Sequence, residues 1–97
     1  MRFKTVFGDE RLAARLAERL APFEALFSGG ASVWRKRDVN GGSRIYICLA
    51  GEVEVGRQLW EELRKLGAVC PQAKVFDKRA VLSGCISLPD KFLNPDV

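Results

Sequence analysis

Two hydrophobic periods alternate along this chain. Residues 2–7 alternate basic and apolar side chains, the period of two that is typical of a β-strand, and Gly8-Asp9 follows as a turn or helix cap. After Asp9, apolar residues recur every three or four positions, which predicts one buried helix face: Leu12, Leu16, Leu20, Phe23 and Phe27. Pro22 cannot donate a helical hydrogen bond, so we expect a kink or a short second helix before Gly29-Gly30.

The second half of the chain predicts a hairpin, a helix and further strands. Residues 31–38 and 43–50 are β-prone runs around Asn40-Gly41, which favours a type I′ turn. A helix is expected over 54–66, ended by Gly67, with an apolar face of Val55, Leu59, Leu63 and Leu66. One or two strands follow at 74–76 and 80–88. Residues 89–97 are expected to form an irregular tail that docks through Phe92 and Leu93.

This order of elements predicts one α+β domain over residues 1–97. Strand, helix, strand, strand, helix, strand is the βαββαβ pattern of the ferredoxin-like fold, an antiparallel sheet with two helices on one face. Right-handed crossovers would place the first strand beside the third, at the centre of the sheet.

Composition narrows the chemistry. The 97 residues contain no histidine, no phosphate-loop glycine pattern and no Cys-x-x-Cys pair, so we expect no catalytic site, no metal and no cofactor. We interpret the three cysteines as reduced thiols in the core: Cys48, Cys70 and Cys85. A reactive thiol among them stays an open alternative. The longest apolar run, residues 45–50, is too short to span a bilayer, and the expectation is a soluble, cytoplasmic protein.

A basic sheet face is the main functional candidate. If Asn40-Gly41 is a two-residue loop, Trp34 opposes Ile47 and Lys36 opposes Ile45 beneath the helices. Arg37 then opposes Arg44 on the reverse face. Burying Phe3, Thr5 and Phe7 of the first strand sends its basic residues to the same face. Six binding candidates then gather on a face without helical cover: Arg2, Lys4, Arg35, Arg37, Arg44 and Tyr46. The whole chain carries a net charge of only +4. Five positively charged side chains on one face would therefore produce a concentrated positive electrostatic field there.

Two anionic partners fit this predicted face. One is an acidic protein surface or a protein that handles nucleic acid. Small, basic, histidine-free domains of this build resemble stoichiometric phage inhibitors, anti-CRISPR proteins among them, and this resemblance implies non-enzymatic protein binding. The other partner is single-stranded nucleic acid, with phosphates on the arginines and a base on Tyr46.

The order of elements, with residues 44–49 as a strand before a helix, resembles an RNA-recognition motif. Other interpretations stay open at this stage. The face is also explained by solvated charge alone, the row of Arg11, Arg15 and Arg19 is a second candidate for phosphate contact, and Trp60 is either core or an interface anchor. The sequence does not decide the oligomeric state.

Overall fold

The computed structural model describes residues 1–37, 39–40 and 42–93. Along the chain the elements are β1 (Phe3–Thr5), α1 (Glu10–Arg19), η1 (Ala21–Phe23), α2 (Glu24–Phe27), β2 (Ala31–Arg37), β3 (Ser43–Leu49), β4 (Val53–Gly56), α3 (Arg57–Lys65), β5 (Lys74–Val75), β6 (Arg79–Leu82), β7 (Cys85–Pro89) and η2 (Asp90–Phe92), where η marks a 3₁₀ turn.

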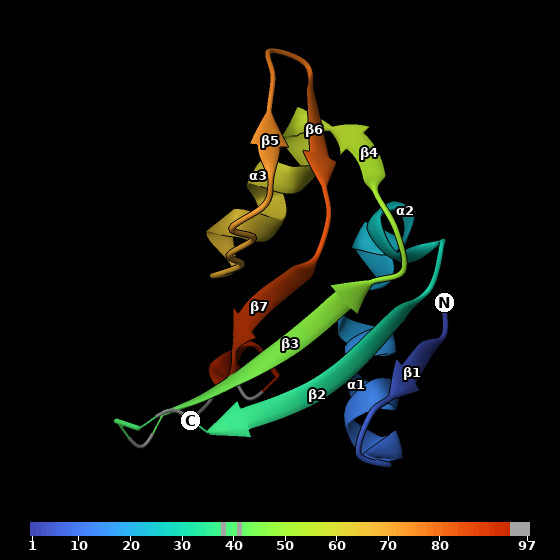
Figure 1. Ribbon diagram of the computed structural model, residues 1–97, viewed down its shortest axis with the longest axis vertical. Helices are drawn as coiled ribbons and strands as arrows, with labels where there is room; N and C mark the ends of the chain where they lie inside the picture. Colours follow the sequence, from blue (N-terminus) through green and yellow to red (C-terminus); the bar gives the residue numbers. More distant parts are fainter. Residues whose placement is uncertain (38, 41, 94–97) are drawn as a thin grey trace.

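The strands form two sheets. The larger has the order β1-β2-β3-β7, in which β1 runs parallel to β2 and the other neighbours are antiparallel. The smaller is antiparallel with the order β4-β6-β5. In Figure 1, α1 lies behind the larger sheet, α2 lies near β4, and α3 lies against the smaller sheet. Among the described residues, no helix lies over the opposite face of the larger sheet.

The predicted ferredoxin-like fold is wrong. The structure is a small α+β fold with helices α1, α2 and α3 and two sheets, and β1 lies at the edge of the larger sheet beside β2. The crossover through α1 and α2 connects neighbouring parallel strands, so β1 never reaches the centre. The expected helix at 54–66 begins only at Arg57, because residues 53–56 pair with β6 as strand β4.

A bend in one two-stranded ribbon produces the second sheet. The Leu49 amide donates to the Gly84 carbonyl at 2.8 Å, and the next strand pair is Val53 with Leu82. Residues 50–52, which connect β3 to β4, thus lie opposite Ser83 alone, and this unequal spacing bends and twists the ribbon as a bulge does. Gly84 allows this bend because its φ of 75° lies in the left-handed region. The ribbon consequently leaves the larger sheet as β3 and β7 and continues as β4 and β6.

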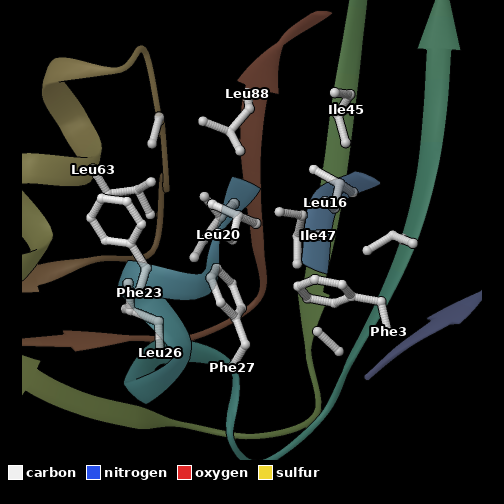
Figure 2. Packing of buried hydrophobic residues seen from close by; sticks show 14 of the residues in the cluster. Phe3, Leu16, Leu20, Phe23, Leu26, Phe27, Ile45, Ile47, Leu63 and Leu88 are labelled. Carbon is white, nitrogen blue, oxygen red and sulfur yellow. The ribbon is translucent and has the colours of Figure 1, made fainter. Parts of the chain in front are cut away.

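The first helical segment follows the sequence pattern. Asp9 caps α1 by accepting a hydrogen bond from the Leu12 amide at 3.0 Å, and Leu16 and Leu20 are fully buried. Pro22 lies in η1, which is followed by the short helix α2, so the predicted break is confirmed. Figure 2 shows Leu16 and Leu20 packed between the phenylalanines and the inner side chains of β3 and β7. This packing fixes which sheet face is covered.

The arginine row of α1 holds the C-terminal segment. Arg15 Nη2 donates to the Leu93 carbonyl at 2.7 Å, and Arg19 Nη2 donates to the Phe92 carbonyl at 3.2 Å. Leu93 is buried, which confirms that this segment docks through it, although residue 89 belongs to β7 and residues 90–92 form η2. Residues 94–97 of the expected tail lie outside the described residues. Two of the three helix arginines therefore have a structural role.

Candidate functional site

The predicted hairpin register is wrong by one residue. Trp34 pairs with Tyr46, and Lys36 pairs with Arg44, so the pairing places Arg37 opposite Ser43 and five residues between β2 and β3. The expected two-residue loop at Asn40-Gly41 does not fit this spacing, and Gly41 itself lies outside the described residues. A shift of one residue turns every side chain of β2 to the other face of the sheet.

Burial explains why the chain adopts this register. Ala31 and Val33 face α1, together with Ile45 and Ile47 of β3, and all four are buried. The expected register would have put Trp34 and Lys36 there, and a lysine ammonium beneath a helix would lose its hydration. Burying two small apolar side chains instead leaves Trp34 and Lys36 on the uncovered face.

The uncovered face of the larger sheet consists of three rows of paired residues. The first row is Lys4, Ser32, Cys48 and Cys85, the second is Trp34, Tyr46, Ser87 and Val69, and the third is Lys36, Arg44 and Pro89. We call this surface the open face. Among its described residues none is acidic, so the field of Lys4, Lys36 and Arg44 has no compensating carboxylate within the rows.

An aromatic pair occupies the centre of the open face. The rings of Trp34 and Tyr46 stack across β2 and β3 with their centroids 5.8 Å apart and an angle of 14° between the ring planes. Both residues are only partly buried. Offset stacking stabilises such a pair and holds both rings in a fixed orientation. The face thus offers a rigid aromatic surface to solvent.

A basic pocket adjoins this aromatic pair. Lys36, Arg37, Arg44 and Tyr46 line an open hollow of about 100 Å³ at the end of the hairpin. Arg44 is positioned from below, because its Nη2 donates to Ser87 Oγ at 3.0 Å and to the Gly67 carbonyl at 3.4 Å. Three cationic side chains and a phenol around one small hollow are donors suited to an oxyanion such as phosphate.

The six predicted binding residues do not share one face. Lys4, Arg44 and Tyr46 lie on the open face, with Arg2 beside Lys4 at its far end. Arg35 and Arg37 belong by alternation to the helix-covered face. Arg35 binds Asp90 of η2, with 2.9 Å between Nε and Oδ1, and leaves the candidate site. Arg37 reaches the basic pocket from the end of β2.

Sequence reasoning missed Trp34 and Lys36. Both were assigned to the buried face, because the assumed loop length set the parity of β2. The run itself carries no clear signal, because each parity of β2 mixes apolar and basic side chains: Val33 with Arg35 on one, Trp34 with Lys36 on the other. A longer hairpin loop would have moved both residues to the open face.

The cysteine interpretation also needs correction. Cys48 and Cys85, which were expected to be core thiols, form a disulfide between β3 and β7 on the open face. Cys70 is the free thiol and is buried, with its Sγ 3.4 Å from the Ser83 carbonyl. Within residues 1–37, 39–40 and 42–93, no group of three or more His, Cys, Asp or Glu side chains is placed to hold a metal ion.

Trp60 does not contribute to an exposed site. Trp60 is 2% exposed and belongs to the core, so it is not an interface anchor.

Over the described part of the chain, no helix is long and apolar enough to cross a membrane. Comparison with known protein families, curated proteins and solved structures finds no match to this chain.

Proposed function

We propose that this domain binds single-stranded nucleic acid through the open face and does so without catalysis. The observation that carries the proposal is the position of the basic pocket directly beside the stacked Trp34 and Tyr46 rings. Aromatic side chains give stacking platforms to unpaired bases, and cationic grooves follow the phosphate backbone. Both features lie together here on a sheet face without helical cover.

The charges of the open face are arranged in a way that destabilises the sheet, which a surface that serves only solubility does not require. Lys36 and Arg44 are directly opposed on neighbouring strands, and like charges in that position destabilise a sheet. A phosphate between them would turn this repulsion into two attractions. Solvated surfaces also mix charges of both signs, whereas the described rows of the open face carry only positive ones.

Removing one ring of the pair tests the stacking. Replacing Tyr46 by alanine should weaken binding of a mixed-sequence single-stranded oligonucleotide about fivefold or more, since a stacked base contributes ~1–3 kcal/mol. Fluorescence anisotropy of the labelled strand measures this loss. The matched control is Phe76→Ala, because Phe76 is an aromatic residue that is 44% exposed and lies under an arginine, Arg79, but belongs to the smaller sheet's hairpin. The control variant should bind like the wild type.

Salt dependence separates this function from protein binding. If three phosphates are neutralised, log Kd should rise with log salt with a slope of about 2, roughly 0.7 per phosphate contact for single strands. Absence of binding at about 50 mM salt would end the nucleic-acid proposal. An affinity that is independent of salt would contradict the phosphate contacts.

A second candidate function is stoichiometric binding of a protein, as a phage-type inhibitor would require. A separate observation favours it: Val6 and Phe7, adjacent in the loop after β1, are 50% and 78% exposed. Large apolar side chains left in solvent side by side are typical of protein contacts. In this proposal Phe7 inserts into an acidic partner surface while the basic face gives charge complementarity.

A cytoplasmic location stays a prediction. Its support from reduced thiols is lost, because Cys48 and Cys85 are joined, and disulfides persist mainly in oxidising compartments.

A further inference from the structure

A second cationic hollow lies at the opposite end of the open face. Arg2, Lys4, Ser32 and Cys48 contribute to its lining, and its volume is about 380 Å³. Lys4 pairs with Ser32 on β2, whereas the basic pocket begins at Lys36 on the same strand. The two hollows therefore lie along one strand direction, with the aromatic pair between them.

The separation of the hollows sets the direction of a ligand. Ser32 and Lys36 are four residues apart on β2, which corresponds to about 13 Å at ~3.3 Å per residue. Stacked nucleotides advance about 3.4 Å per step, so a single strand covers this distance in at most about four steps. A dinucleotide, which advances by a single step, is too short to touch both hollows at once.

We propose that Arg2 and Lys4 form a second phosphate subsite, and that a bound single strand lies along β2 and β3 from this subsite to the basic pocket. This inference rests on the proposed nucleic-acid function. Bases contact Trp34 and Tyr46 at the centre, and backbone phosphates are held at both ends. Ser32 adds a hydroxyl to the second subsite, which suits a phosphate oxygen as acceptor.

The polar groups of the second hollow fit a phosphodiester, because Arg2 and Lys4 supply two cations and no ring of the aromatic pair reaches it. Ala31, Leu49 and Ala50 also line the hollow. Arg2 and Lys4 are both exposed at the edge strand, so a backbone passing over β1 and β2 meets them without displacing protein groups. Phosphate contacts of this kind position a strand and carry no base preference.

The test compares ligand lengths in one pair of variants. The double variant Arg2→Glu, Lys4→Glu is measured against the matched control Lys74→Glu, Lys78→Glu, which has the same net charge but changes the smaller sheet's hairpin. The probes are a dinucleotide and a single-stranded DNA of about eight nucleotides, within the site sizes usual for such proteins. Competition anisotropy at low salt gives both affinities.

We expect the Arg2 and Lys4 changes to weaken the longer strand about tenfold and to reduce its salt slope by about 1, while the dinucleotide is affected no more than in the control. If the wild type binds the longer strand and the double variant binds it equally well, the second subsite is wrong and the proposed function stands. If both lengths are weakened equally, the changes act through the general field and the subsite is also wrong. If the wild type binds neither probe, the proposed function fails and this inference fails with it.

Discussion

Replacing Lys36 and Arg37 by glutamate and Arg44 by glutamine is expected to weaken binding of single-stranded nucleic acid at least about a hundredfold. These three side chains surround the hollow beside Tyr46, so the change replaces attraction by repulsion at contact distance. Glutamine at position 44 keeps donor groups near Ser87 and Gly67, which Arg44 contacts. Anisotropy titration at low salt measures the loss.

The matched control makes the same change in net charge elsewhere. Arg11→Glu, Lys74→Glu, Lys78→Gln alters exposed cations on α1 and on the smaller sheet's hairpin, so it should lower affinity only a few-fold through the general field. Both variants should keep the wild-type circular dichroism spectrum, since neither removes core volume. Equal loss of binding in the two variants would contradict a localised pocket.

Removing the disulfide should produce the largest change in stability. Cys48 and Cys85 are 37 residues apart in sequence, so their bond restricts a long loop of the unfolded chain. Replacing both by alanine should lower the free energy of unfolding by about 3 kcal/mol, in the range for native disulfides that close loops of this size. Denaturant titration followed by circular dichroism gives this value.

Two comparisons isolate the effect of the bond. Cys70→Ala removes a buried thiol without a cross-link and should cost only about 1 kcal/mol. Adding a thiol reductant should lower the unfolding midpoint of the wild type and leave that of the double alanine variant unchanged. A wild type whose midpoint does not respond to reductant, with no loss in the double variant, would mean that the bond contributes nothing to stability.

The α1 region could be predicted because local signals agreed there. Asp9 as a cap, the spacing from Leu12 to Phe27 and the break at Pro22 each depend only on neighbouring residues. The strand at 53–56 was missed because Val55 satisfies both periods: it fits the helical spacing to Leu59 and the alternation of a strand. Pairing with β6, more than twenty residues later, decides between them.

The site could be predicted only in part, since it depends on which alternate residues of β2 face the helices. In β2, one parity contains Ala31, Val33 and Arg35 and the other contains Ser32, Trp34 and Lys36, so alternation alone gives no clear inner face. The assumed turn then determined the result, and it was too short. Lys4, Arg44 and Tyr46 were placed correctly on the open face because their own strands have a clear apolar parity.

The disulfide was beyond local reasoning. An odd number of cysteines without close spacing favours reduced thiols, and only the alignment of β3 with β7 brings Cys48 opposite Cys85. The same alignment puts Ser87 under Arg44 and so positions the basic pocket. Long-range strand pairing thus decides both the covalent link and the geometry of the candidate site.

Fluorescence of Trp34 tests the central claim most directly. The two tryptophans differ in environment, because Trp34 lies on the open face whereas Trp60 is 2% exposed in the core. Stacking of a base on the Trp34–Tyr46 pair should quench indole emission as a single-stranded oligonucleotide is added at low salt. The account predicts saturable quenching in the wild type and none in Trp34→Phe, which keeps an aromatic ring at that position. Equal quenching in both proteins, or none in the wild type, would contradict binding of nucleic acid on the open face.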